Sequence, residues 1–331
     1  MANQGLVLVT GATGFVGAAV ARAVCAAGFS LRVTARAGSS LANLAGLEAE
    51  TVPLDLTAPA SFAPALRGCR YLFHAAADYR LWVPDAAAMR RVNIDGTLAL
   101  LREAARQGVE RSVYTSSVAA LGLTPDGTPA DETTQILPAH HVGVYKQSKF
   151  EAEQAVRALA ATQDIVIVNP STPVGPGDVK PTPTGQMVLD AARGAMPAYV
   201  DTGINIAHVD DVAAGHLLAL EKGRAGQPYI LGGENLMLRD LLALIAQETG
   251  RPAPRLRLPI APLMPIAWAM ERLAERTGKT PLMTPDILRM AKKTMFFSSA
   301  RAQAELGYAP RPARLAVRDA LAWFRASGRL S

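Results

Sequence analysis

The side chains best suited to acid–base chemistry in this sequence are those of a tyrosine and a lysine four residues apart. On a helix, Tyr145 and Lys149 would lie one turn apart on the same face. A phenol has a reference pKa of about 10, which is too high for efficient proton transfer at neutral pH. A neighbouring ammonium group stabilises the phenolate and lowers that pKa. Such a pair also occurs by chance on helix surfaces, so its context must decide.

Two serines provide part of that context. The run Tyr-Thr-Ser-Ser at residues 114–117 ends an apolar segment that predicts a strand, and Ser117 precedes Tyr145 by 28 residues. A serine hydroxyl near a substrate carbonyl can donate a hydrogen bond and stabilise developing negative charge. Serine, tyrosine and lysine together therefore indicate the oxidation of an alcohol or the reduction of a ketone.

A glycine-rich turn near the N-terminus predicts a dinucleotide site. Residues 6–9 predict a buried strand and residues 18–27 a helix, with Gly11, Gly14 and Gly17 near the turn between them. Gly11 permits the tight turn, Gly14 lets backbone N–H groups approach a pyrophosphate, and Gly17 allows close packing of helix and strand. A tight turn without a ligand is the alternative, and the strand–turn–helix context favours the dinucleotide.

The end of the second expected strand, at residues 31–35, bears on the choice of cofactor. An NAD enzyme would normally present Asp or Glu there to bind the ribose hydroxyls, and no acidic residue occurs between Gly28 and Leu47. Arg36 can instead bind a 2′-phosphate, with Ser39 and Ser40 as further donors. The sequence therefore favours NADP over NAD, although a solvated arginine at a strand end would look the same.

The rest of the first half alternates strands and helices, which predicts an α/β fold with a doubly wound parallel sheet of the Rossmann type. Ligands bind such sheets at the carboxyl ends of the strands. Residues 170–185 contain five prolines and three glycines and predict a loop. The further strands are expected at 50–54, 71–74, 111–115, 165–168 and 229–231, and the helices at 89–107, 150–162, 208–220, 237–248 and 265–276.

Composition excludes several classes of protein. The chain has 331 residues, half of them hydrophobic, only two cysteines and a formal net charge of +6. Aromatic residues make up only 5%, which argues against nucleic acid as a partner. No His or Cys spacing suggests a metal site. The chain begins too close to its first strand for a signal peptide and lacks a long enough apolar run for a transmembrane helix, so a cytoplasmic protein is expected.

An apolar stretch and two basic clusters leave peripheral membrane contact open. Residues 258–270 are the most apolar part of the chain outside the predicted sheet, and packing within the second lobe is the favoured interpretation. A surface that contacts lipid is the alternative. The basic clusters, which are favoured as solvated faces, are Arg289, Lys292 and Lys293, and Arg311, Arg314 and Arg318.

The motifs resemble those of known families. T-G-x-x-G-x-x-G at 10–17, with Y-x-x-x-K, resembles extended short-chain dehydrogenases/reductases. The segments A-A-D-Y-R-L-W at 76–82, N-P-S-T-P-V-G-P at 169–176, K-P-T-P-T-G at 180–185, M-P-A-Y-V-D-T-G at 196–203 and K-K-T-M-F-F-S-S at 292–299 are similar to the hopanoid-associated sugar epimerase family, which is also labelled dihydroflavonol-4-reductase-like. That resemblance implies an NAD(P)-dependent oxidoreductase or epimerase acting on a sugar or polyol group, free or lipid-linked, in hopanoid biosynthesis. An NADPH-dependent carbonyl reductase and a non-catalytic NADP-binding regulatory protein are the alternatives.

The resemblance also implies roles for individual residues. It selects Ser117 over Ser116 as the catalytic serine and places Asn93 beside Tyr145 and Lys149 as a support for the lysine. The candidate cofactor-binding residues are Gly11, Thr13, Gly14, Phe15, Val16, Gly17, Arg36, Asp55, Leu56, Ala75, Ala76, Ala77, Thr115, Ser116, Tyr145, Lys149, Pro170, Ser171 and Thr172. The candidate substrate residues are Tyr79, Arg80, Trp82, Ser117, Lys180 and Tyr199.

The resemblance further implies a discontinuous division of the chain. Residues 1–172 and 206–232 would form the dinucleotide-binding domain, and residues 173–205 and 233–331 a smaller, mostly helical substrate lobe. His208, Asp210 and Asp211 match a family signature for which capping and hydrogen bonding between the lobes is the expected role. Many proteins of this kind are homodimers, so a dimer is an open expectation.

Overall fold

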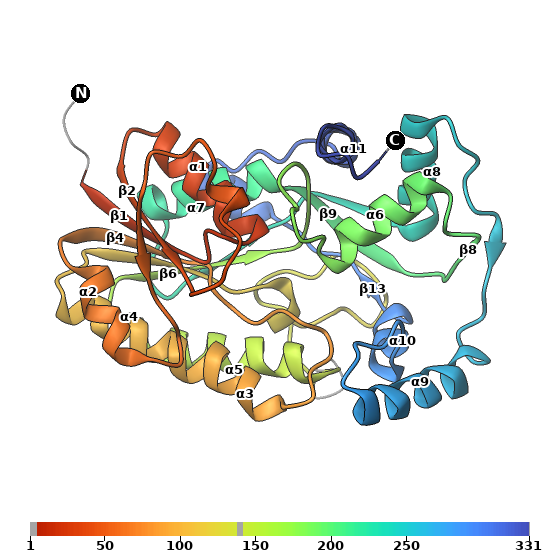
Figure 1. Ribbon diagram of the computed structural model, residues 1–331, viewed down its shortest axis with the longest axis horizontal. Helices are drawn as coiled ribbons and strands as arrows, with labels where there is room; N and C mark the ends of the chain where they lie inside the picture. Colours follow the sequence, from red (N-terminus) through yellow and green to blue (C-terminus); the bar gives the residue numbers. More distant parts are fainter. Residues whose placement is uncertain (1–4, 138–141, 331) are drawn as a thin grey trace.

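A computed structural model describes residues 5–137 and 142–330 of the chain and contains a seven-stranded parallel sheet (Figure 1). Because its strands are joined by helices on both faces, it confirms the predicted doubly wound sheet of the Rossmann type. In spatial order the strands are β10 (Pro228–Leu231), β6 (Ile165–Pro170), β5 (Arg111–Thr115), β4 (Cys69–His74), β1 (Leu6–Thr10), β2 (Ser30–Ala35) and β3 (Glu50–Pro53).

Successive side chains of the central strand β1 contribute to two different cores. Val7 and Val9 pack under α1 (Phe15–Ala26) and α7 (Val209–Lys222) on one face of the sheet. Leu8 points to the opposite face, which is covered by α2 (Phe62–Leu66), α4 (Thr97–Arg106) and α5 (Val144–Leu159). A strand buried on both faces is apolar throughout, which is why residues 6–9 lack a polar alternation.

The helix expected over residues 89–107 is present, but it is not α-helical throughout. Helix α3 (Ala86–Arg90) and α4 are joined by a π-helical segment, η3 (Arg91–Gly96). A Cβ atom at Gly96 would lie 2.5 Å from the carbonyl oxygen of Leu56, so only glycine allows this close approach. The spacing of apolar residues in this segment does not predict a π-helical turn, in which the helix is locally wider.

A second, smaller sheet surrounds β9 (Gly203–His208). β9 pairs with β7 (Thr172–Val174), β11 (Glu234–Met237) and β13 (Thr294–Met295), and only the pairing with β11 is antiparallel. Two further strands, β8 (Ala198–Tyr199) and β12 (Leu256–Arg257), pair with each other. The helices of this part are α6 (Pro183–Arg193), α8 (Leu238–Thr249), α9 (Leu263–Thr277), α10 (Pro285–Ala291) and α11 (Ala313–Ala326) (Figure 1).

The loop predicted over residues 170–185 is therefore shorter than expected. Pro173 lies in β7, whose only partner among the described strands is β9, and an edge position tolerates proline. Pro183 occupies the first turn of α6, where a missing N–H costs nothing. Thr182 caps that helix by accepting a hydrogen bond from the N–H of Gly185 at 3.1 Å.

The remaining helical segments are short. The 3₁₀ turns are η1 (Ala42–Leu44), η2 (Pro59–Ser61) and η4 (Val118–Ala120), and a second π-helical segment is η6 (Ala302–Leu306). Ala302 and Leu306 of η6 are buried in the same core as α1 and α7. A segment late in the chain therefore completes the core on this face of the seven-stranded sheet.

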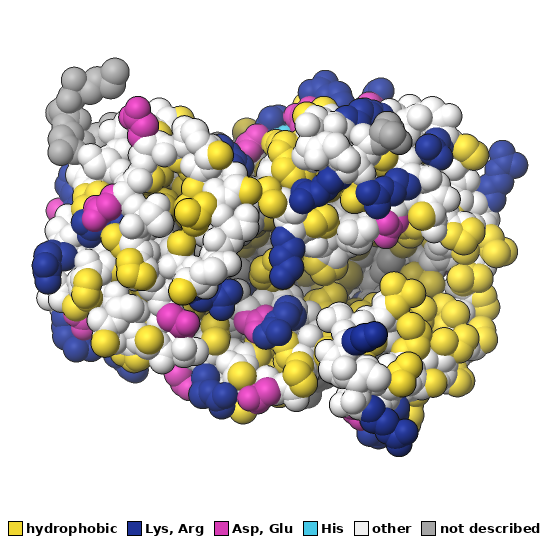
Figure 2. All heavy atoms as spheres, viewed as in Figure 1, with side chains coloured by type: hydrophobic (Ala, Val, Ile, Leu, Met, Phe, Trp, Pro, Cys, Tyr) yellow, Lys and Arg dark blue, Asp and Glu magenta, His cyan; other side chains and the backbone are white. Residues whose placement is uncertain are grey.

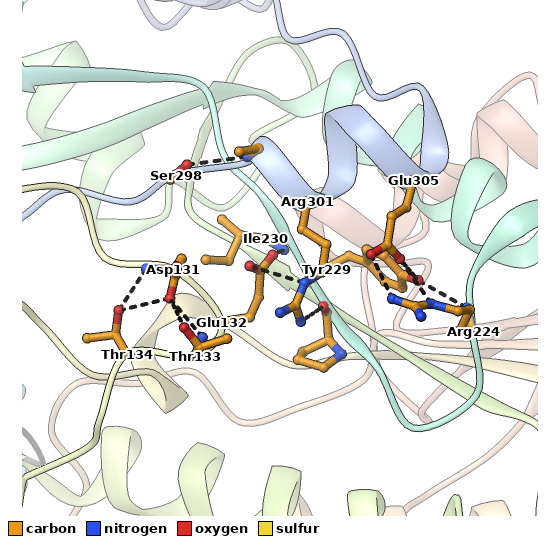
Figure 3. Close-up of polar contacts among 12 residues, drawn as sticks. Asp131, Glu132, Thr133, Thr134, Arg224, Tyr229, Ile230, Ser298, Arg301 and Glu305 are labelled. Carbon is orange, nitrogen blue, oxygen red and sulfur yellow. Dashed lines mark hydrogen bonds and ion pairs between the residues drawn. The ribbon is translucent and has the colours of Figure 1, made fainter.

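The outer strand β10 is covered by polar side chains (Figure 3). The N–H of Ile230, at the edge of the sheet, donates to a carboxylate oxygen of Glu132 at 2.8 Å. Glu305 accepts a hydrogen bond from the Tyr229 hydroxyl at 2.9 Å and forms an ion pair with Arg224 at 2.7 Å. The contact from Glu132 satisfies a backbone N–H of an edge that would otherwise be open to pairing with another chain.

The predicted structural role of the His208 segment is confirmed. His208 caps α7 by accepting from the N–H of Asp210 at 3.1 Å, and its other ring nitrogen lies 3.2 Å from a carboxylate oxygen of Asp319. Asp211 accepts from the backbone N–H and the guanidinium of Arg311, at 2.8 and 2.7 Å. These contacts tie the start of α7 to α11 and the segment before it.

The interpretation of residues 258–270 as packed core is wrong. Ile266 and Trp268 are more than half exposed, and only Ala267 and Ala274 of α9 are buried. Apolar composition alone does not distinguish a helix that packs from one that presents the same side chains to its surroundings.

Candidate active site

Helix α5 carries the tyrosine and the lysine, as predicted. It begins directly after Gly143, whose φ of +86° lies in a region that favours glycine. Tyr145 is half-buried, whereas Lys149 is 3% exposed and donates a hydrogen bond to the carbonyl oxygen of Thr115 at 3.0 Å. Burial lowers the pKa of Lys149 to about 8, although the carboxylate of Glu153 raises it in part. The ammonium is therefore held at the carboxyl end of β5.

Ser117 and Ser116 have different surroundings. Burial raises the pKa of Tyr145, and the nearby Ser117 hydroxyl opposes this shift. Ser116 is buried and donates to a carboxylate oxygen of Glu153 at 2.6 Å. Ser117 is therefore the serine that the structure brings to the tyrosine.

Glu153 is a residue of this site that the sequence analysis missed. It is fully buried and accepts hydrogen bonds from Ser116 and from the amide of Asn169, both at 2.6 Å. Arg157 pairs with its other oxygen at 2.6 Å. The signal was present, because Tyr145, Lys149, Glu153 and Arg157 follow one another at intervals of four along one face of α5.

Asn93 lies in the π-helical segment and joins two parts of the site. Its amide oxygen accepts from the N–H of Asp78 at 2.7 Å. Its amide nitrogen donates to the Asp78 carbonyl at 2.8 Å and to the Ser148 hydroxyl at 3.0 Å. Asn93 therefore fixes the loop after β4 against α5 beside Lys149, without a direct hydrogen bond to that lysine among the described contacts.

The glycine turn has the geometry of a cradle for a phosphate group. A Cβ atom at Gly11 would lie 2.7 Å from the backbone nitrogen of Ala76, and one at Gly17 would lie 2.2 Å from the Gly11 oxygen. Gly14 precedes α1 in an extended conformation, and no side chain caps the helix there. The first N–H groups of α1 are thus left for a ligand or for water, an arrangement that fits a dinucleotide pyrophosphate.

The turn is braced from both sides. The carbonyl oxygen of Thr13 accepts a hydrogen bond from the amide of Asn43 at 3.1 Å. The hydroxyl of Thr10 accepts from the N–H of Ala76 at 3.2 Å and contacts a ring nitrogen of His74 at 2.8 Å. Burial lowers the pKa of His74 to about 3, so this histidine is a neutral core residue. The backbone at 75–77 therefore passes directly beside the glycine turn, and Phe15 and Val16 continue the turn into α1.

The end of β6 presents a polar atom without a partner. The hydroxyl of Ser171 is buried and has no hydrogen-bond partner within the described part of the chain. It lies between Pro170, the last residue of β6, and Thr172, the first residue of β7. A buried donor of this kind fits a bound polar ligand at the carboxyl edge of the sheet.

Arg36 follows β2 and is exposed. Residues 5–137 and 142–330 provide no hydrogen bond or ion pair for its guanidinium. Hydrogen bonds from Thr57 are the main cause that lowers the pKa of Asp55, and the charge of Arg36 makes the smallest contribution. Asp55 mainly accepts from Thr57, whose hydroxyl and N–H lie 2.7 and 2.8 Å away. The neighbouring Leu56 is buried.

Apart from Ser117, the substrate candidates are not brought together. Arg80 folds back onto Asp78 in an ion pair. Tyr79 is 45% exposed, Trp82 is half-buried, and Lys180 is exposed without a described ion pair. Tyr199 packs against the core of the second lobe, and no described contact joins it to Tyr145.

One further lysine at the site was not predicted. The ammonium group of Lys146 lies 3.9 Å from the sulfur of Met295 in β13, so α5 contacts the second sheet directly beside Tyr145. Burial, followed by the charge of Lys293, lowers the pKa of Lys146 to about 8. Both lysines on this stretch of α5 are therefore partly desolvated.

The fold and this arrangement define an NAD(P)-binding enzyme of the extended short-chain dehydrogenase/reductase type. The profile of the NAD dependent epimerase/dehydratase family matches residues 7–232, and the chain belongs to that family.

Three similar proteins cover nearly the whole chain. A Synechocystis protein named "Putative dihydroflavonol 4-reductase" is 44% identical over 97% of this chain and 94% of its own length. Sterol demethylase protein B of Methylococcus capsulatus is 37% identical over 97% of this chain and 98% of its own. The crystal structure of gox2253 is 55% identical, with a TM-score of 0.89 over 98% of this chain and 99% of the other.

Two kinds of feature are absent from the described residues. Among them, no group of three or more His, Cys, Asp or Glu side chains is arranged to hold a metal ion. None of the described helices combines the length and the apolar character needed to cross a membrane.

Proposed function

We propose that this protein is an NADP-dependent oxidoreductase that interconverts a secondary alcohol and a ketone. One observation carries the proposal. Ser117, at the carboxyl end of β5, lies close to Tyr145 and Lys149 in the first turns of α5, beside the sheet that also carries the glycine turn. The residues proposed to bind the cofactor and those proposed to handle the proton thus share one edge of the sheet.

Each of the three side chains has a distinct task in the reduction. Tyr145 donates its phenolic proton to the carbonyl oxygen of the substrate, and the Ser117 hydroxyl donates a hydrogen bond to the same oxygen. Lys149 stabilises the resulting phenolate, and the Thr115 carbonyl holds that lysine in place, while the charge of Glu153 favours its ammonium form. The dinucleotide, when bound, supplies the hydride. In the oxidation the phenolate accepts the proton.

For the substrate we propose a sugar or polyol group, free or attached to a polycyclic lipid, in hopanoid biosynthesis. The motifs at 169–176 and 292–299 support this class through their resemblance to hopanoid-associated sugar epimerases. The name of the Methylococcus relative refers to a sterol, which is also a polycyclic lipid with an oxygen substituent. We place the enzyme in the cytoplasm and keep residues 1–172 and 206–232 as the proposed dinucleotide-binding domain.

An epimerase that retains its cofactor is the second candidate, because the matching family includes epimerases. Such an enzyme oxidises and re-reduces one bound substrate and shows no net consumption of cofactor. Arg36 favours the reductase, since NADPH is the usual cellular reductant and a free guanidinium at the end of β2 suits its 2′-phosphate. A non-catalytic role would leave the grouping around Tyr145 without a purpose.

Replacing Arg36 by alanine is expected to remove most of a preference for NADP over NAD. A charge-assisted contact to a phosphate contributes roughly 1.5–3 kcal/mol, or about ten- to a hundredfold in affinity. Isothermal titration calorimetry with both dinucleotides measures the preference in the unaltered protein and in the Arg36→Ala variant. Arg36→Lys is the matched control, because it retains the charge but loses the planar fork. Tighter binding of NAD by the unaltered protein would show that Arg36 has been misinterpreted.

A further inference from the structure

The most exposed apolar side chains of this protein are concentrated in one segment. Five of the eight large hydrophobic residues that are exposed in the described chain lie within residues 256–282, and their exposed fractions range from 52 to 84%. We call these five side chains the α9 face. They are Leu256, Ile266, Trp268, Leu273 and Leu282.

Helix α9 uses little of its surface for packing. Ala267 and Ala274, seven residues apart, mark the single buried stripe, and α9 packs mainly against α10. Figure 2 shows hydrophobic side chains gathered at the lower right, over the region of α9 and α10 in Figure 1, with basic side chains at the margin. A contiguous apolar area with a polar rim is typical of a contact surface.

A wider stretch around this segment, residues 251–293, accounts for the positive charge of the whole chain. Residues 251–293 contain nine basic and three acidic residues, an excess of six that equals the formal net charge of the protein. The remaining residues are balanced, with 25 of each sign. Arg272 and Arg289 pair with Glu275 and Asp286. The exposed side chains of Arg276, Lys279 and Lys292 have no ion pair among the described residues.

We propose that the α9 face docks on the surface of an anionic lipid bilayer. Leucine, isoleucine and tryptophan side chains enter the boundary between headgroups and acyl chains, while surrounding Lys and Arg bind anionic headgroups. The alternative occupant, a second copy of the chain, is disfavoured by charge. A two-fold symmetric contact through this face would place the basic excess of one copy against that of the other.

Docking would also orient the proposed active site. Asp286 of α10 lies beside the start of α5, because a Cβ atom at Gly143 would be 3.5 Å from its carboxylate oxygen. Tyr145 follows two residues later. A lipid-linked substrate could thus reach the site from the membrane side, a consequence that rests on the proposed function. The docking itself does not depend on the proposed function, because it is measured without substrate or cofactor.

Vesicle flotation tests the proposal with the full-length protein. We expect binding to vesicles of phosphatidylcholine mixed with phosphatidylglycerol, little binding to phosphatidylcholine alone, and release at high salt. The double variant Ile266→Asp, Leu273→Asp should bind the mixed vesicles at least about tenfold more weakly, because two apolar contacts are lost and two negative charges added. Both side chains are exposed, so circular dichroism should show an unchanged fold.

Leu41→Asp is the matched control, since Leu41 is 51% exposed but lies outside the α9 face. It should bind as the unaltered protein does. Failure of the unaltered protein to bind mixed vesicles at low salt would overturn the proposal, as would equal binding by the double variant. A dimer by light scattering that the double variant converts to a monomer would also overturn it, because a second copy would then cover the face.

Discussion

Replacement of Tyr145 by phenylalanine is expected to lower kcat by roughly 10²- to 10⁴-fold, the contribution typical of a positioned acid–base group. The phenol is the only group of the site proposed to exchange a proton with the substrate, and the neighbouring Ser117 hydroxyl cannot replace it. Cofactor affinity should stay within a few-fold, because the glycine turn and Arg36 are untouched. Steady-state kinetics and calorimetry on the same preparation separate the two effects.

Tyr71→Phe is the control for this substitution. Tyr71 lies in β4, packs edge-on against Phe29 and also loses one hydroxyl group when it is changed. It should retain nearly full activity. A Tyr145→Phe enzyme with a near-normal rate would show that another group transfers the proton and that the assignment of Tyr145 is wrong.

Replacement of Glu153 by alanine is expected to destabilise the protein by about 3–5 kcal/mol, as when one partner of a buried ion pair is removed. Its carboxylate is fully buried, and its loss leaves the donor groups of Ser116, Asn169 and Arg157 without their acceptor. Because Ser116 directly follows β5 and Asn169 lies near the end of the neighbouring strand β6, the carboxyl edge of the sheet should loosen as well. Urea denaturation followed by circular dichroism gives the change in the free energy of unfolding.

Glu151→Ala is the matched comparison two residues away on the same helix. Glu151 is partly exposed and pairs with Arg90 at the surface, so its loss should cost less than about 1 kcal/mol. If Glu153→Ala proved no more harmful than Glu151→Ala, the network around Glu153 would not stabilise the site as described.

The strands of the large sheet were predictable because each is a short apolar run bounded by turn residues. Residues 6–9, 111–115 and 165–168 all fall within strands of the structure. The tyrosine–lysine pair was also predictable, since two residues four apart on a helix share a face whatever surrounds them. These features depend on local sequence alone.

Features that depend on distant contacts were not predictable. The role of the Glu153 carboxylate depends on Ser116, which follows β5, and on Asn169 in β6, and both are far from it in the sequence. β7 forms because β9, about thirty residues later, pairs with it. The exposure of Ile266 and Trp268 depends on which face of α9 finds a neighbour, and hydropathy does not report that.

The central claim is that one edge of the sheet holds NADP with its reactive end at Tyr145. A crystal structure of the protein with NADP tests it most directly. The pyrophosphate should contact the turn between Gly11 and Gly14, the 2′-phosphate should contact Arg36, and the nicotinamide should lie beside Tyr145 and Lys149. A dinucleotide bound elsewhere, or one whose nicotinamide lies away from Tyr145, would contradict the account.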